Sequence, residues 1–339
     1  MIDNVTKLRK VELELLEAFA NVCEAHDLKW YVFFGTLLGT MRFDGFLPWD
    51  DDIDVAMPER DFTELCAHKE WFDERFFLQT QTDEGFLRFA KLRRNGTCAF
   101  DRPLLESLKQ GGHHGIPIDI IPLVAQPGAE SFHMPMMSSA NKKDAVFHRS
   151  WFEPASEALF EDIRIRMPAA PRKILRAVYE DWDWPSGAQT CEPSYWFFDT
   201  ERSYEDYVQR YTGMLEGIEG KKVFLFGAAD SLRIWLERYG KRGKVVCTFD
   251  NDPGKWGTKA FGVDVRDPKS LPELMDADSR VIIVSLWHQE IGRQLERMGI
   301  RDYFVFLDYY YTFDQDGNRI IRPEDEEEMK KPNRPKWLG

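Results

Sequence analysis

Residues 33–57 read FFGTLLGTMRFDGFLPWDDDIDVAM, and this stretch indicates both a fold and a chemistry. Asp52 and Asp54 alternate with Ile53 and Val55, a period-two pattern that predicts a strand. Alternate side chains of a strand share a face, so both carboxylates point to the same side. Two adjacent carboxylates repel each other unless a cation lies between them. We therefore expect a divalent cation here, Mg²⁺ or Mn²⁺, because Mg²⁺ prefers oxygen ligands.

The residues before this strand predict an anion-binding turn. A strand expected at Trp30–Phe34 stops at Gly35, and a helix is expected to begin at Thr36. Glycine lets the backbone approach a ligand closely, and the free N–H groups of a helix N-terminus favour phosphate oxygens. The Thr36 hydroxyl and Arg42, one or two turns on, add expected phosphate contacts. A phosphate cradle followed by a dicarboxylate strand suits a nucleotide–metal complex.

A third carboxylate is expected from GIPIDIIPL, residues 115–123, where Asp119 interrupts an apolar strand. The alternative for Asp119 is a structural carboxylate with its own partners. Asp50 and Asp51 stay open at this point: they cap the strand entry, hold water around a metal, or bind a second metal.

Composition bounds the class of protein. The 339 residues suggest about two domains, and the net charge of −13 argues against nucleic acid as a partner. The N-terminus lacks an apolar signal segment, and no apolar run is long enough to span a bilayer. We expect a cytoplasmic enzyme, peripheral at the inner membrane face if its acceptor is lipid-linked. The scattered cysteines predict neither a zinc cluster nor a disulfide framework: Cys23, Cys66, Cys98, Cys191 and Cys247.

The motif G-T-L-L-G-x-x-R-x-x-G-F-x-P-W-D-D-D-I-D, which begins at Gly35, resembles the signature of the LicD family of phosphocholine transferases, shared by fukutin-related proteins. The similarity continues through KLRRNGT and GIPIDIIPL and covers roughly residues 1–200. The resemblance implies a nucleotidyltransferase fold. It also implies transfer of a phospho-alcohol, such as phosphocholine, from a CDP-linked donor to a glycan or lipid-linked glycan hydroxyl. The cysteines that give the animal relatives a zinc site are absent, so no zinc is expected.

The resemblance assigns roles to the residues found above. Gly35 and Thr36 would contact the donor phosphate, and Asp52 and Asp54 would bind metal. Asp119 would be a third metal ligand or the base that accepts the acceptor's proton. The basic residues expected to neutralise phosphate, in KLRRNGT, are Lys91 and Arg93.

The second half of the chain has a different pattern. A connecting helix is expected at 201–219, a small Rossmann-like domain with a parallel sheet at 220–312, and a charged tail at 313–339. The domain resembles those attached to bacterial polysaccharide-synthesis enzymes. Gly227 and Asp250 lie where a dinucleotide-binding loop and its ribose-binding acid would be.

The second and third glycines of that loop are replaced by Ala229 and Leu232, so a structural or regulatory domain competes with a nucleotide site. His288 at a helix start, the pair His113-His114 and the Trp residues near 182–184 have the same two interpretations, ligand contact or plain structure.

The fold class expected for the whole chain is α/β, with an α+β nucleotidyltransferase domain at residues 1–200. Two other functions compete with phospho-alcohol transfer. One is nucleotidyl transfer to a small hydroxyl compound, and the other is an inactive protein that binds a nucleotide or sugar nucleotide. The donor, the acceptor, the oligomeric state and the number of metals stay open.

Overall fold

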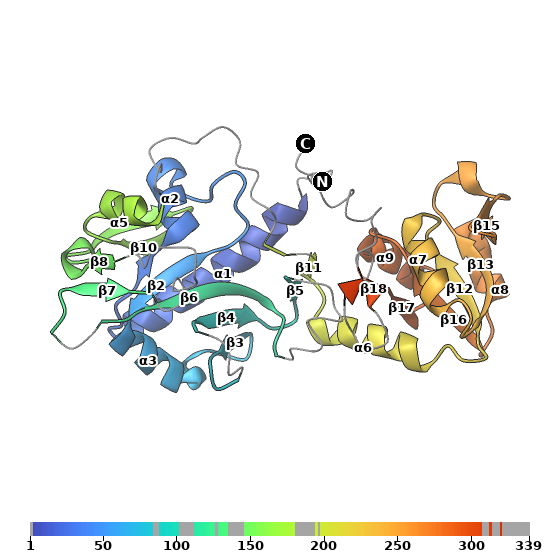
Figure 1. Ribbon diagram of the computed structural model, residues 1–339, viewed down its shortest axis with the longest axis horizontal. Coiled ribbons are helices and arrows are strands. Elements are labelled where there is room, and N and C mark those ends of the chain that lie inside the picture. Colours follow the sequence, from blue (N-terminus) through green and yellow to red (C-terminus); the bar gives the residue numbers. More distant parts are fainter. Residues whose placement is uncertain are drawn as a thin grey trace. The chain divides into compact units, whose positions relative to one another are not determined.

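A computed structural model describes residues 3–83, 88–101, 112–125, 128–134, 146–179, 194–195, 197–306, 312–313 and 319–320. The fold is mixed α/β, as expected, with several sheets and helices (Figure 1). The chain divides into two compact units, Met1–Arg102 with Gln110–Tyr204, and Pro103–Lys109 with Glu205–Gly339. The main division near Tyr204 lies close to the boundary expected at residue 200.

The first unit is built on a five-stranded sheet in the order β1-β2-β6-β4-β3. β2 and β6 are parallel, and the other neighbours are antiparallel. Apolar side chains from these strands and from the long helix α1 (Asp3–Ala25) fill the core, because α1 turns Leu8, Leu15 and Phe19 inward. The strands are β1 Tyr31–Val32, β2 Asp54–Pro58, β3 Phe76–Gln79, β4 Ala90–Arg94 and β6 Ile116–Leu123.

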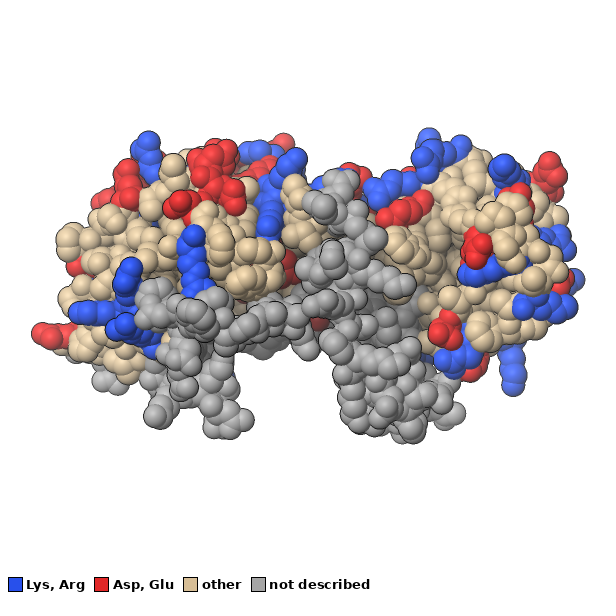
Figure 2. Space-filling view, turned by 90° about the horizontal axis from the view of Figure 1, so that it is seen from above, with Lys and Arg blue, Asp and Glu red and all other residues tan. Residues whose placement is uncertain are grey.

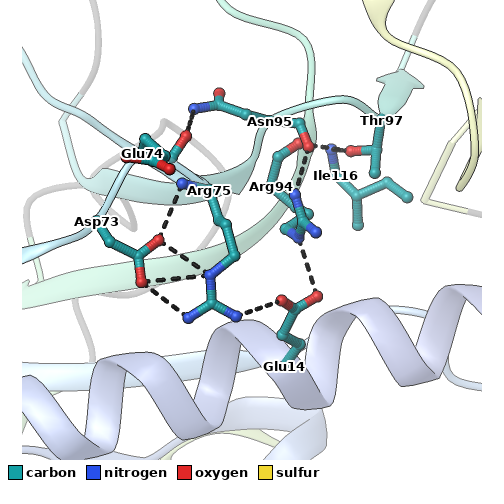
Figure 3. A network of polar contacts seen from close by, with 8 residues as sticks. All are labelled: Glu14, Asp73, Glu74, Arg75, Arg94, Asn95, Thr97 and Ile116. Atoms are coloured by element: carbon teal, nitrogen blue, oxygen red, sulfur yellow. Dashed lines mark hydrogen bonds and ion pairs between the residues drawn. The ribbon is translucent and has the colours of Figure 1, made fainter.

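A polar network ties α1 to the edge of this sheet (Figure 3). Glu14 of α1 accepts hydrogen bonds from Arg94 of β4 at 2.9 Å and from Arg75 at 3.2 Å. Arg75 also forms a bidentate contact with Asp73. The Thr97 hydroxyl donates to the Arg94 carbonyl at 2.6 Å. This network fixes the helix against the strands that carry the candidate site.

Smaller elements surround the sheet. α2 (Phe34–Phe43) contacts β2, and α3 (Glu59–Ala67) packs on β2 and β6. The paired strands are β5 Cys98–Phe100 with β11 Phe197–Asp199, β7 Ser131–His133 with β8 Val146–His148, and β9 Ser156–Phe160 with β10 Ile163–Met167. Pro171–Val178 form the helix α5, and Phe147 of β8 pairs with Phe132 of β7 in a β-ladder. The helical pattern of residues 140–150 predicts a helix there, and over the described part this prediction is wrong.

The strand expected to start at Asp52 begins two residues later. β2 starts at Asp54, and the preceding carbonyl of Ile53 already accepts a hydrogen bond from Asp119 N at 2.9 Å. The strand expected at Trp30–Phe34 is shorter too, because Phe34 has a φ of +39° and opens α2. Local sequence predicted the elements, and the tight turns between them set their ends.

The second unit contains a six-stranded sheet in the order β14-β15-β13-β12-β16-β17, parallel except at the edge strand β14. Phe224, Phe226 and Phe249 fill its core with Trp235 of α7. The strands are β12 Lys222–Phe226, β13 Lys244–Phe249, β14 Lys259–Ala260, β15 Val263–Arg266, β16 Ser279–Ile283 and β17 Tyr303–Val305. The helices are α6 Tyr204–Glu216, α7 Asp230–Tyr239, α8 Leu271–Leu274 and α9 His288–Arg297. Strands alternate with helices along this stretch, as the sequence predicted.

The surfaces of both units are charged. On the face shown in Figure 2, Lys and Arg side chains are mixed with Asp and Glu side chains over each unit. Within the described ranges, no helix is both long and apolar enough to cross a bilayer. The tail expected at 313–339 lies almost entirely outside the described residues.

Candidate active site

A row of polar residues crosses the central sheet of the first unit. Asp54 of β2 lies opposite Asp119 of β6 in the sheet register. Asp119 lies opposite Lys91 of β4, and Lys91 lies opposite Gln79 of β3. Register partners project to the same face of a sheet, so these four side chains form one row, which we call the polar rung. Asp54 and Asp119 are therefore brought together, although 65 positions separate them in the sequence.

One lysine balances one end of the polar rung. Lys91 Nζ lies 2.5 Å from Asp119 Oδ1, and the two side chains are 20% and 26% exposed. Burial raises the pKa of Asp54 well above its usual range, and the neighbouring charges of Asp52 and Asp119 raise it further. The nearby Lys91 lowers it only in part. The single lysine thus does not offset the burial and the charge repulsion that disfavour a charged Asp54.

Thr36 holds Asp54, the first residue of β2, in place. Its hydroxyl accepts a hydrogen bond from the Asp54 backbone N–H at 2.8 Å, and the Thr40 hydroxyl donates to the Thr36 carbonyl at 2.7 Å. Thr36 is only 2% exposed. The structure therefore gives Thr36 a positioning role toward Asp54, while its contact with a donor phosphate stays a prediction.

Three consecutive carboxylates, Asp50–Asp52, precede β2, and we call them the acidic loop. Burial raises the pKa of Asp50 to about 7 and that of Asp52 to about 6. The two carboxyl groups are hydrogen-bonded to each other, a contact that two ionised groups do not tolerate without a proton or a cation. Asp50 also packs directly on Gly35, where a Cβ would collide with its Oδ2. A side chain at residue 35 would therefore displace the Asp50 carboxyl from its present position.

The acidic loop is held from both sides by segments distant in the sequence. Arg9 of α1 donates to the carbonyl of Leu47 at 2.8 Å and to that of Asp50 at 2.7 Å. On the other side, the Ser194 hydroxyl lies 2.7 Å from Asp51 Oδ1. These contacts fix the backbone and one carboxylate of the loop.

Two further ionisable groups lie beside the loop. Glu12 of α1 is fully buried, and within the described part of the chain neither of its carboxyl oxygens has a hydrogen-bond partner. Burial, with the charges of Asp52 and Asp51, raises its pKa well above its usual range. Burial also raises the pKa of Tyr195, and the charge of Glu12 is the next cause.

The other basic residues expected at the site lie differently. Arg93 is only 8% exposed, donates through Nη1 to the Gly115 carbonyl at 2.7 Å, and binds Gln79 through Nε. It supports the sheet in this structure, and its contact with phosphate stays a prediction. Arg42 lies half-buried in the last turn of α2.

The donor set fits a divalent cation by charge and by ligand type. Asp52, Asp54 and Asp119 supply carboxylate oxygens, the ligand type that such a cation prefers. The charge of Asp119 raises the pKa of both Asp52 and Asp54, and the charge of Asp52 raises the pKa of Asp54. Among the residues that the structure describes, no three His, Cys, Asp or Glu side chains stand close enough together to hold a metal ion as they are. The carboxylates thus offer the chemistry of a cation site, and cation binding stays a prediction.

The histidines considered as ligand contacts, His113 in the first unit and His288 in the second, are both packed into the structure. His113 Nε2 lies 2.7 Å from Asn95 Oδ1, and the ring stacks on Phe77 at 4.6 Å. His288 is 4% exposed and opens α9. The Trp residues near 182–184 lie outside the described residues.

In the second unit, Asp250 contacts the loop that follows Gly227, so the two residues expected to bind a nucleotide lie close together. Asp250 Oδ2 accepts a hydrogen bond from Ala228 N, just after Gly227, at 3.0 Å, and another from Lys255 at 2.9 Å. Gly227 has a φ of +125°, and a Cβ there would collide with the Val284 carbonyl. Asp250 thus binds the loop of its own domain, and nucleotide binding at this site stays a prediction.

The sequence patterns did not predict that four further residues belong to this site: Arg9, Glu12, Ser194 and Tyr195. Glu12 did leave a signal, since it interrupts the apolar stripe of the first helix between Leu8 and Leu15. A charged residue on such a stripe is rarely buried without a role. Ser194 left none, because the sequence around it shows no period.

Comparison with known proteins bears on this site. Residues 27–170 match the family model described as LicD/FKTN/FKRP, nucleotidyltransferase domain. The chain is similar to the lipopolysaccharide cholinephosphotransferase LicD of Haemophilus influenzae, with 39% identity over 62 residues, or 18% of this chain and 23% of that protein. The match thus spans less than a quarter of the length of this curated relative.

Among solved structures, the chain is similar to RSP in complex with beta-NADH, with 18% identity, 34% of this chain and 60% of that chain covered, and a TM-score of 0.23. It is also similar to RSP, a Rex-family repressor, with 16% identity, 43% and 66% covered, and a TM-score of 0.23. Likeness at this score supports no argument about this chain.

Proposed function

This chain belongs to the LicD family through its domain at residues 27–170, and from that premise we propose a cation-dependent phosphotransferase that acts in cell-surface glycan synthesis. The donor would be a CDP-linked alcohol such as CDP-choline, and the acceptor a hydroxyl of lipopolysaccharide, teichoic acid, capsule or a lipid-linked precursor. The observation that carries the proposal is the polar rung: Asp54 and Asp119 are register partners, and Asp52 lies beside them with a single lysine in the row.

The residues present suit an in-line displacement. A bound divalent cation would offset the charge of the donor diphosphate and of the leaving CMP. Asp52 and Asp54 would hold it, and Thr36 fixes the backbone of Asp54 for that purpose. In the reaction the acceptor oxygen forms a bond to the distal phosphorus, and the bond from that phosphorus to the bridging oxygen breaks. CMP leaves with the bond's electron pair.

The proton of the acceptor hydroxyl needs a base. Asp119 is the proposed base, because it lies in the same row as Asp54 and keeps Lys91 at 2.5 Å. The lysine holds the carboxylate in place before the reaction. Once Asp119 has taken the proton, Lys91 is free to pair with donor phosphate, the role that the sequence predicted for it.

The test is release of CMP from a panel of CDP-alcohols in the presence of Mg²⁺, with and without glycan acceptors. Asp54→Asn should lower release by roughly 100-fold, because a cation ligand supports several kcal/mol of transition-state stabilisation. Asp162→Asn is the matched control, since Asp162 is exposed in the turn between β9 and β10.

Product analysis separates the competing functions. CMP with a phospho-alcohol-modified acceptor supports the proposal. Pyrophosphate with a nucleotidylated acceptor would establish nucleotidyl transfer instead. Binding of a CDP compound with no turnover under any acceptor would favour a binding protein, and failure of every CDP compound to bind with cation present would refute the CDP-donor hypothesis.

A further inference from the structure

We propose that Ser194 is a positioning residue of this active site: by holding Asp51 and bracing Asp52, it sets how tightly the site binds its divalent cation. The inference rests on the proposed cation-dependent function. Ser194 lies 24 positions beyond the last residue matched by the family model, so the family domain alone does not contain this part of the site.

Ser194 makes a concentrated set of contacts with the acidic loop. Its hydroxyl lies 2.7 Å from Asp51 Oδ1 and 3.3 Å from Asp52 Oδ2. Its backbone N–H lies 3.2 Å from each carboxylate oxygen of Asp51. One residue therefore contacts both oxygens of one carboxylate and one oxygen of the next.

These contacts give Asp51 and Asp52 different chemistry. Asp51 is 8% exposed, and burial raises its pKa, but the hydrogen bonds from Ser194 and the charge of Arg9 work against that rise. A carboxylate that already accepts several hydrogen bonds is a poor cation ligand, because binding would displace them. Asp52 receives from Ser194 only the longer contact, at one oxygen, so Ser194 engages it less than Asp51.

The acidic loop needs such an anchor. Its three carboxylates are consecutive and lie before β2, so no strand ladder orders Asp50, Asp51 and Asp52. Arg9 holds only the backbone of this loop, through the carbonyls of Leu47, Pro48 and Asp50. Ser194 contacts the carboxylates themselves. Without its hydroxyl, Asp51 would lose its short hydrogen bond, and its carboxylate would be less firmly held beside Asp52.

Tyr195 strengthens the assignment of this segment to the site. Tyr195 follows Ser194 directly in the chain, and its pKa is raised by burial and then by the charges of Glu12, Asp119 and Asp52. Residues 194 and 195 thus return the chain to the carboxylates after the family-matched domain has ended.

The experiment measures the affinity of the full chain for Mn²⁺ without donor, by the electron paramagnetic resonance signal of free Mn²⁺. Ser194→Ala should weaken binding about 10-fold, which corresponds to the roughly 1.4 kcal/mol expected for a hydrogen bond to a charged group. Ser194→Thr keeps the hydroxyl and should bind within about twofold of wild type. Ser156→Ala removes an exposed hydroxyl on β9 of the same unit and should have no effect.

Wild-type affinity in Ser194→Ala would overturn the proposal, and so would equally weak binding by Ser194→Thr, since that would show packing rather than hydrogen bonding. If Ser194→Ala does not fold, Ser194→Cys keeps the size of the side chain with a much weaker donor and makes the same test. Weakened Mn²⁺ binding in Ser194→Ala with no CDP-alcohol turned over would refute the proposed function alone. Turnover with unchanged affinity would refute the positioning role alone.

Discussion

Replacing Glu12 with Gln should stabilise the cation-free protein, and the gain should grow with pH. Glu12 is fully buried, lies near three carboxylates of the acidic loop, and has no hydrogen-bond partner within the described residues. Burial and those charges raise its pKa well above the usual 4.5. The folded state therefore binds a proton more tightly than the unfolded state, and stability falls as pH rises from the unfolded pKa to the folded one.

The size of the effect follows from this shift. Each pH unit between the two pKa values removes about 1.4 kcal/mol of stability that Gln would retain. At pH 6.5, about two units above the unfolded pKa, wild type should be less stable than Glu12→Gln by up to about 3 kcal/mol. Near pH 4.5 wild type and Glu12→Gln should differ by only about 0.5 kcal/mol. At that pH Glu12 is uncharged in the folded state, and its carboxyl is only partly ionised in the unfolded state.

The assay is urea unfolding in EDTA at pH 4.5, 5.5, 6.5 and 7.5, followed by tryptophan fluorescence. Glu17→Gln is the control, because Glu17 is exposed on the same helix and should show no such trend. A difference between wild type and Glu12→Gln that does not change with pH, or a variant less stable than wild type at pH 7.5, would refute the reasoning.

Two further substitutions probe the structure. Thr36→Val leaves the Asp54 N–H without its partner in a buried position, so it should cost about 1–3 kcal/mol in urea unfolding and lower CMP release, whereas Thr36→Ser should keep most of both; a fully stable and active Val variant would contradict the positioning role. Gly227→Ala should destabilise the second unit by at least roughly 2 kcal/mol, because φ is +125° and the Cβ meets the Val284 carbonyl. Gly257→Ala has positive φ with open space around it and should cost about 1 kcal/mol; equal losses in both variants would show that the collision does not matter.

Several features of the site follow from local sequence. The sequence predicted one strand that carries Asp52 and Asp54 and a second that carries Asp119. Both strands are present, but Asp52 lies before the start of β2. The period of a strand gives the face of a side chain but not its partner on the next strand. The pairing of Lys91 with Asp119 depends on the register of β4 against β6, so sequence alone predicted a phosphate-binding lysine and missed the ion pair.

The misses arise from long-range contacts and turns. Arg9 reaches the acidic loop across 38 to 41 positions, and Ser194 across 142 to 143, distances over which no sequence period operates. The contacts of Asp250 with Ala228 N and Lys255 also depend on the turns that follow β12 and β13, and the sequence pattern did not predict them. Binding of a ribose by Asp250 stays a prediction.

The polar rung also bears on how the first unit folds. Asp54, Asp119 and Lys91 become neighbours only when three strands, which other segments of the chain separate, have paired. Closing such loops is slow, and the like charges of the two aspartates oppose the last step rather than assist it. A cation that recognises the finished row cannot accelerate the search for it. The bound cation would instead lower the unfolding rate and leave the refolding rate unchanged. It would therefore lengthen the lifetime of the native state.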